Sequence, residues 1–362
     1  MAVAAFHILL IMVMIYLLAI VTEAYFVEAL DEIARRWELP EHVAGASLMA
    51  MGSSAPELAI AIFALFREGG AHADVGIGTI VGSAIFNILV IPGASALVRP
   101  IDVGVRVMLR DSIFYLASVA LLVWAIQDGQ IEVLEAVALL ALYGSYIFVL
   151  FRSRGQQGKD APQAPEQQRE ETDPEPSEKA HSDDESSQSF VSKWICRGLG
   201  WLGGDPVENP YRTFFVSIAC IAGACWFLVD SALIFSETVG IPPVVVALTI
   251  LAAGTSIPDL ISSMIVAKQG RGEMAVSNAV GSNIFDILIG LGLPWIIALT
   301  LLSRQVAVDN NGLWTSTILL LGTVLLLTGL VALGRGLGRA KGALLVAVYA
   351  GYVLWVFLGN GG

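Results

Sequence analysis

Apolar residues fill most of this chain in long runs that short polar segments separate. A run of about 17 to 25 apolar residues is long enough to cross a bilayer as a helix. Ten such runs occur, approximately at residues 6–30, 43–66, 76–98, 111–127, 131–151, 211–235, 242–268, 274–302, 312–333 and 342–359. The pattern predicts an all-α polytopic membrane protein with ten transmembrane helices.

A polar stretch in the middle of the chain divides these runs into two groups of five. Residues 152–189 hold ten acidic residues against five Lys or Arg residues, and a segment of this composition is predicted to be disordered. We therefore expect a first five-helix unit (1–151), an acidic loop (152–210) and a second five-helix unit (211–362). The loop carries much of the net charge of −12, so this charge says little about partners. Nothing in the sequence indicates a nucleic-acid ligand or a cofactor.

Composition and basic residues support a membrane protein and predict its orientation. Of the 362 residues, 56% are hydrophobic and 14% are charged, which is unusual for a soluble domain. Lys and Arg concentrate on cytoplasmic connections. With the N-terminus outside, the outer connections hold only Arg67 and Arg304. Apart from the long 152–210 loop, which is left out because long loops report poorly on orientation, the inner connections then hold Arg35, Arg36, Arg99, Arg106, Arg110, Lys268, Arg271, Arg335, Arg339 and Lys341. We expect both termini outside and the 152–210 loop in the cytoplasm.

The two halves repeat the same motifs. PEHVAGASLMAMGSSAPEL (40–58) aligns with PPVVVALTILAAGTSIPDL (242–260), so that Glu57 corresponds to Asp259. GTIVGSAIFNIL (78–89) aligns with SNAVGSNIFDIL (277–288), so that Asn87 corresponds to Asp286. Because each half has an odd number of spans, the second copy enters the membrane from the opposite side. Inverted-topology repeats of this kind are typical of secondary transporters, whose sites lie near the membrane midplane.

The repeated acids are the strongest functional signal. A duplicated scaffold explains repeated Gly and Pro, but carboxylates inside a membrane are costly and usually mark a site. Residues three or four apart share a helix face, which predicts four polar faces: Ser53, Ser54 and Glu57; Thr255, Ser256 and Asp259; Ser83 and Asn87; Ser282 and Asp286. Pro56 and Pro258 also leave backbone carbonyls near Gly52 and Gly254 without their usual donors.

Every group on these faces offers oxygen, which is the ligand of hard cations. Calcium takes about 6–8 oxygen ligands, and sodium has nearly the same radius, so one cavity can hold either ion. Glu57 and Asp259 together balance one Ca²⁺. Asp286 adds a third charge, which suggests a further monovalent cation or a proton. Simpler roles remain for some residues: Gly82 and Gly281 suit close helix packing, and Ser83 and Ser282 can bond to carbonyls of their own helices.

These motifs resemble the two alpha repeats of the cation/calcium exchangers, and most closely those of the potassium-dependent sodium/calcium exchangers. GSSAPEL with GTIVGSAIFNIL, and AAGTSIPDL with MAVSNAVGSNIFDILIGLGLPW, carry the resemblance, which covers roughly residues 40–98 and 242–296. It implies ten helices and a calcium site on Glu57 and Asp259. It also implies sodium ligands at Ser53, Ser54, Ser83, Thr255, Ser256, Ser282 and the backbone carbonyls of Ala50 and Ala252.

The resemblance also bears on potassium and on regulation. Potassium-dependent members carry an aspartate at the position of Asp286, whereas many potassium-independent animal exchangers carry an asparagine. The 152–210 loop is too short and too polar for a folded calcium-binding regulatory module.

We therefore expect an antiporter that extrudes calcium in exchange for sodium across the plasma membrane by alternating access, with potassium as a candidate ion transported together with calcium. As in the family, helices 1 and 6 are expected to slide past the core. A calcium/proton antiporter and a potassium-independent exchanger are the alternatives within this class. An intramembrane aspartyl protease would need a GxGD motif, which WLGGD at 201–205 does not match. A cation channel is disfavoured because an inverted repeat suits alternating access.

Overall fold

The computed structural model describes residues 2–37, 50–67, 72–102, 105–160, 200, 202–270, 272–308, 313–333 and 336–359. Almost all of them are helical. The first half contains α1 (Ala2–Val21), the π-helix η1 (Thr22–Val27), α2 (Glu28–Arg36), α4 (Ala50–Ser53), α5 (Ala55–Phe66), α6 (Ala73–Val98), α7 (Val105–Ile126) and α8 (Val133–Asp160). The second contains α10 (Pro210–Val239), α11 (Pro243–Val246), η4 (Ala247–Leu251), α12 (Ala252–Lys268), α13 (Gly272–Phe285), η5 (Asp286–Leu291), α14 (Gly292–Ile296), η6 (Ile297–Leu301), α15 (Leu313–Ala332) and α16 (Arg339–Gly359).

In the described part of the chain, nine helices are long and apolar enough to cross a membrane. The protein is thus a multi-pass, predominantly helical membrane protein, as the hydrophobic pattern predicts. The second expected span, 43–66, is described only from Ala50 onward, as α4 and α5. The number ten and the inverted repeat therefore stay predictions.

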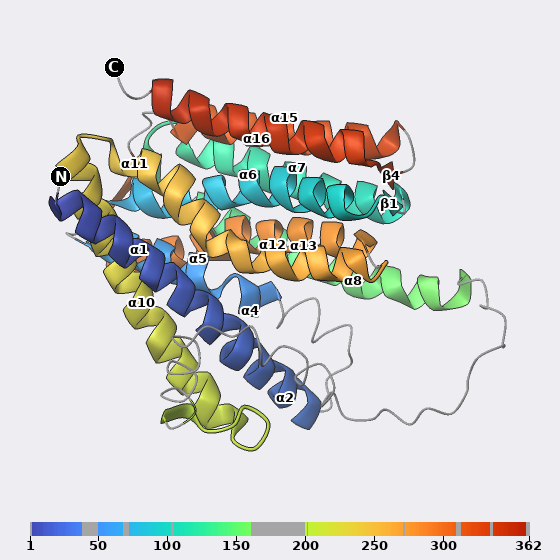
Figure 1. Ribbon diagram of the computed structural model, residues 1–362, viewed down its shortest axis with the longest axis horizontal. Coiled ribbons are helices and arrows are strands. Elements are labelled where there is room, and N and C mark those ends of the chain that lie inside the picture. Colours follow the sequence, from blue (N-terminus) through green and yellow to red (C-terminus); the bar gives the residue numbers. More distant parts are fainter. Residues whose placement is uncertain are drawn as a thin grey trace.

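One helix forms the centre of the molecule. α6 consists mostly of apolar residues, and nearly all of its residues are buried, as expected for a helix that other helices surround. It contacts α5, α12, α13, α15 and α16. Figure 1 shows α6 within a layer of near-parallel helices, while α1 and α10 cross this layer obliquely. The motif residues of α6 therefore lie inside the protein, where polar side chains avoid lipid.

Two very short strand pairs join the connections at the helix ends. β1 (Ile101–Asp102) pairs with β4 (Gly336–Leu337), and β2 (Gln130–Ile131) pairs with β3 (Val306–Ala307), both antiparallel. Each pair links a connection of the first half with one of the second half. The pairs join connections that the sequence analysis assigns to the same side of the membrane.

The acidic segment departs in part from its prediction. α8 continues to Asp160, so the expectation of disorder is wrong for 152–160, where the chain extends the preceding helix. The remaining residues of that segment, 161–189, lie outside the described residues.

Candidate ion-binding site

The two halves meet at the repeated motifs. α5 and α6 carry the motifs of the first half, α12 and α13 those of the second, and α6 contacts the other three. The hydroxyl oxygens of Ser83 on α6 and Ser256 on α12 lie 2.9 Å apart and share a hydrogen bond. Residues far apart in the sequence thus come together inside the protein, where both serine side chains are fully buried.

The GSSAPEL motif breaks its helix. α4 ends at Ser53 and α5 begins at Ala55, with Ser54 between them at φ −90° and ψ 4°. Pro56 lies in the first turn of α5, where a residue without an N–H group costs no hydrogen bond. In the second half, η4 precedes the motif and Pro258 lies inside the continuous helix α12. The break starts a new helix at Ala55, and Glu57 lies in its first turn, at the centre of the site.

Glu57 and Asp286 are buried acids at this centre. They are 3% and 2% exposed, respectively. The Glu57 carboxyl group lies against the hydroxyl groups of Thr255 and Ser83, and the Asp286 carboxyl group lies against that of Ser54. Three oxygens of this region, Oε2 of Glu57, Oδ1 of Asp286 and Oδ1 of Asn87, are buried without a hydrogen-bond partner among the described residues. Because such orphaned acceptors are costly, they indicate a missing donor or cation.

Asp259 lies at the edge of the same region. It is partly exposed and lines a cavity of about 310 Å³. Glu57, Asp259 and Asp286 are near enough for their charges to repel one another. The described residues contain no group of three or more His, Cys, Asp or Glu side chains that could hold one metal ion by themselves. A cation here would therefore need hydroxyl, amide or carbonyl oxygens as well.

The other candidates occupy different environments. Ser53 and Thr255 line the cavity, and the Thr255 hydroxyl donates to the carbonyls of Leu251 and Ala252 at 3.2 and 3.3 Å. Ser282 is buried, but its hydroxyl donates to the Ala279 carbonyl of its own helix at 3.3 Å. Ala50 is the first residue of α4.

Most of the chain matches the model of one protein family. The model described as sodium/calcium exchanger protein matches residues 7–152 and 210–358. The chain belongs to the sodium/calcium exchanger family. Human sodium/potassium/calcium exchanger 5 is 32% identical over 411 residues, which cover 95% of this chain and 81% of that protein.

Two solved structures have the same fold as this exchanger-family protein. The sodium-calcium exchanger NCX_Mj matches with a TM-score of 0.54 at 23% identity, over 96% of each chain. The H⁺/Ca²⁺ exchanger CAX matches with a TM-score of 0.66 at 13% identity, over 98% of this chain and 88% of that one. At these identities the structures support the fold alone.

Sequence reasoning about this family member missed a buried amide network. Asn283 accepts a hydrogen bond from Nδ2 of Asn87 at 3.0 Å and donates to the Ala84 carbonyl and the Tyr115 hydroxyl at 3.1 and 3.0 Å. Asn283 is fully buried. Because it aligns with Ala84 in the repeat, a search for matching polar residues passes over it. Its occurrence between Ser282 and Asp286, inside an apolar run, was the available signal.

Proposed function

We propose that this protein exchanges calcium for sodium across a membrane by alternating access. The observation that carries the proposal is the set of three buried, unpartnered oxygens of Glu57, Asn87 and Asp286. They face a region where two acids have no basic residue to neutralise them among the contacts described above. Buried carboxylates are normally paired or bound to a metal. A transported cation supplies the missing charge, and membership of an exchanger family favours transport over proteolysis.

The ligands follow from charge and chemistry. Glu57 and Asp259 hold Ca²⁺ and balance its charge, and sodium ions replace it on an overlapping oxygen set. That set comprises Ser53, Ser54, Ser83, Asn87, Thr255, Ser256, Ser282 and the carbonyls of Ala50 and Ala252. Ser282 and the Ala252 carbonyl would first have to give up the hydrogen bonds described above. Ion binding is thus expected to rearrange these groups.

The proposed architecture is two inverted five-helix repeats, 1–151 and 211–362, in the plasma membrane. Both termini lie outside and the 152–210 loop lies in the cytoplasm. Calcium leaves the cell as sodium enters.

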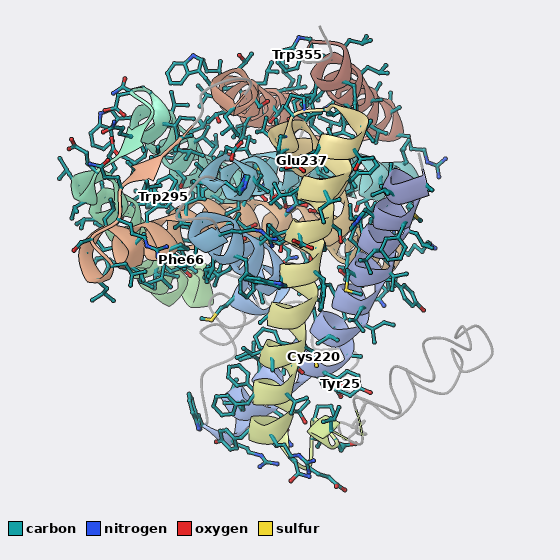
Figure 2. The ribbon with its side chains drawn as sticks, turned by 90° about the vertical axis from the view of Figure 1, so that its left-hand side faces the viewer. Tyr25, Phe66, Cys220, Glu237, Trp295 and Trp355 are labelled. Carbon is teal, nitrogen blue, oxygen red and sulfur yellow. The ribbon has the colours of Figure 1, made fainter. Side chains whose placement is uncertain are left out.

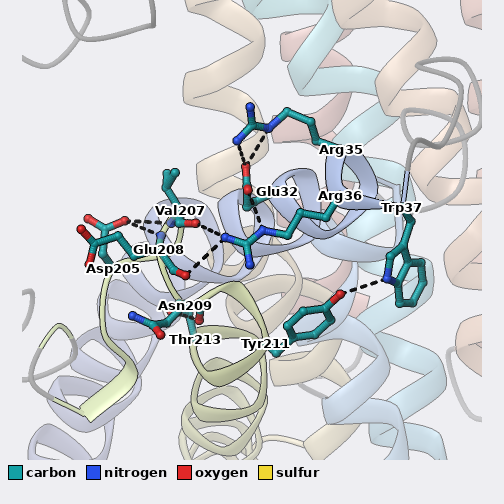
Figure 3. A network of polar contacts seen from close by, with 10 residues as sticks. All are labelled: Glu32, Arg35, Arg36, Trp37, Asp205, Val207, Glu208, Asn209, Tyr211 and Thr213. Carbon is teal, nitrogen blue, oxygen red and sulfur yellow. Dashed lines mark hydrogen bonds and ion pairs between the residues drawn. The ribbon is translucent and has the colours of Figure 1, made fainter.

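Helices α1 and α10 are the proposed moving elements. Figure 2 shows them side by side, and they extend together past the other helices near Tyr25 and Cys220. Side chains at the C-terminal end of α2 contact the chain at the start of α10 (Figure 3). Arg36 is paired with Glu32 at 2.8 Å and donates to the Val207 carbonyl at 2.6 Å, and Trp37 donates to the Tyr211 hydroxyl at 3.0 Å. α1, α2 and α10 can therefore shift as one body against the core.

This body passes over both motif glycines. A Cβ atom on Gly254 would clash with Ile15 of α1, and one on Gly52 would lie 3.1 Å from Cγ2 of Val27 in η1. Small residues allow such close helix approach in membranes. Because both motif glycines lack a side chain, α1 and η1 can move along the motif helices without a steric barrier at these two positions.

The transport experiment separates this proposal from its alternatives. Purified protein is reconstituted into vesicles, and calcium uptake is driven by internal sodium or by a pH gradient without sodium. We expect uptake with the sodium gradient. Uptake driven only by the pH gradient would instead identify a calcium/proton antiporter, the alternative favoured by Asp286, the third acid of the site, which is buried.

The same vesicles test potassium, which we propose travels with calcium at Asp286. The name of the human relative, sodium/potassium/calcium exchanger 5, includes potassium. Asp286 provides the third negative charge of the site, beside Glu57 and Asp259. We expect external potassium to stimulate uptake by the wild type and to have no effect on Asp286→Asn. Equal stimulation of both would exclude Asp286 as the potassium ligand, and no stimulation of the wild type would indicate exchange without potassium.

Asn283 is expected to act by fixing the amide of Asn87. Because Asn283 accepts from Nδ2, Oδ1 of Asn87 is left for the ion. Asn283→Ala should raise the KM for calcium about tenfold, and the same substitution should have little further effect in an Asn87→Ala background. Tyr115→Phe should give a smaller increase. Additive effects of Asn283→Ala and Asn87→Ala on the KM would contradict this role.

A further inference from the structure

The cavity beside Asp259 is lined by apolar residues of α1 and by polar groups of η1 that the motifs do not include. Its lining from this side comprises Ile15, Leu18, Ala19, Thr22, Glu23 and Val27. Opposite them lie Ser53, Thr255 and Asp259, which belong to the ion-binding set proposed above. One wall of the cavity thus belongs to the core site and the other to the proposed moving helix.

Thr22 is the observation that points to a ligand. Its side chain is 5% exposed, it lines the cavity, and its hydroxyl oxygen has no hydrogen-bond partner among the described residues. A buried hydroxyl normally finds a partner. Threonine in a helix usually bonds to a carbonyl of the preceding turn, as Thr79 and Thr249 do here. The Thr22 hydroxyl makes no such bond, so its oxygen is available to bind a ligand in the cavity.

Glu23 adds a charge next to Thr22. It is exposed within an apolar helical segment and lines the same cavity. It is also near enough to Asp259 for the two charges to repel. A carboxylate at this depth is costly unless it faces water or a cation. Both residues open the π-helix η1, and π-helical turns occur often at functional sites.

The position of the cavity along the helices indicates its direction. Ser262 and Asn278 also line it, and both lie nearer than Asp259 to the turn between α12 and α13. That turn lies near Arg99, which donates to the Lys268 carbonyl at 3.2 Å. The cavity therefore extends from Asp259 toward the end of the protein that carries basic residues, which is the proposed cytoplasmic side.

We propose that Thr22, Glu23 and Asp259 form an entry site for hydrated Ca²⁺, distinct from the central site and on the path to it. Two carboxylates match the charge of a divalent cation, and the cavity is large enough for an ion that keeps part of its water shell. Asp259 belongs to both sites, so it can pass the ion from Glu23 to Glu57. The entry site rests on the proposed function for its purpose, but not for its existence.

Equilibrium binding of radioactive calcium to the purified, detergent-solubilised protein tests this site directly. Glu57→Gln weakens the central site and leaves Thr22, Glu23 and Asp259 in place, so we expect residual weak binding in this variant. Adding Glu23→Gln should weaken that residual binding at least about tenfold. Adding Thr22→Val, which keeps the shape and removes the hydroxyl, should weaken it about threefold.

Glu28→Gln is the matched control, because Glu28 is an exposed acid of the same helical segment that does not line the cavity. It should leave the residual binding unchanged. Three results would overturn the entry site: no residual binding in Glu57→Gln, residual binding insensitive to Glu23→Gln, or equal effects of Glu23→Gln and Glu28→Gln. Binding is measured without a gradient, so calcium binding that depends on Glu23 in a protein without transport would refute the proposed function alone.

Discussion

Replacing Glu57 with glutamine is expected to lower sodium-driven calcium uptake at least about 100-fold, because a full charge at 4 Å is worth about 4 kcal/mol at an effective dielectric constant of 20. Glutamine has nearly the same shape and can still bond to Thr255 and Ser83, which lie against the carboxyl group. The variant therefore removes the charge that balances the ion and little else. Initial rates of calcium uptake into sodium-loaded vesicles measure the effect.

Glu135→Gln is a suitable control for this variant. Glu135 is also a buried acid, at 5% exposure, but it accepts a hydrogen bond from the Glu132 backbone N–H at 2.8 Å near the start of α8, away from the motifs. Uptake should stay within about twofold of the wild type, since this carboxylate has a local structural role. If Glu57→Gln takes up calcium at the wild-type rate, the charge of Glu57 is not needed for transport, and the proposed calcium site is contradicted.

Gly82→Ala is expected to destabilise the protein strongly, although it adds one methyl group. A Cβ atom on Gly82 would clash with the carbonyl oxygen of Leu248 and lie 2.7 Å from Cβ of Ala252. Both are parts of the helix backbone or its first side-chain atom, which cannot rotate away. Overpacking of this kind costs about 1–3 kcal/mol, measurable as the free energy of unfolding in mild detergent.

The repeat supplies a matched control for this effect. Gly281 occupies the corresponding position in the second half, and a Cβ atom there would meet no heavy atom of the described structure within 4 Å. Gly281→Ala should be neutral or stabilise the helix by up to about 1 kcal/mol. Equal destabilisation by the two substitutions would show that α6 does not pack against α12 as described. The expectation of close packing is thus confirmed for Gly82 and wrong for Gly281.

The sequence indicated the broad outline because its strongest signals are local. Long apolar runs predict membrane spans by their length alone. Acids inside such runs predict a functional site, because a carboxylate inside a membrane is costly in free energy. The repeat also indicated which helices cross, and the hydrogen bond between Ser83 and Ser256 joins two of them. Helical periodicity and the repeat are therefore enough to predict that these polar faces meet.

Other features depend on tertiary neighbours that no local pattern reveals. Asn283 has Ala84 as its counterpart, so the repeat conceals it, and its role depends on Tyr115 of α7. Glu23 lies outside both motifs and lines the same cavity as Asp259 only because α1 packs against α12. Ser282 bonds to its own helix, although its position in the motif is equivalent to that of Ser83. Equivalent positions in a repeat therefore have different environments.

The central claim is that calcium and sodium compete for one set of oxygen ligands, and a sodium titration of calcium binding tests it most directly. Radioactive calcium is bound to purified protein, and sodium is raised at constant ionic strength with choline as the control cation. We predict that sodium displaces calcium with a Hill coefficient above 1, because more than one sodium ion replaces each calcium ion. Calcium binding that responds equally to sodium and choline would contradict a shared site.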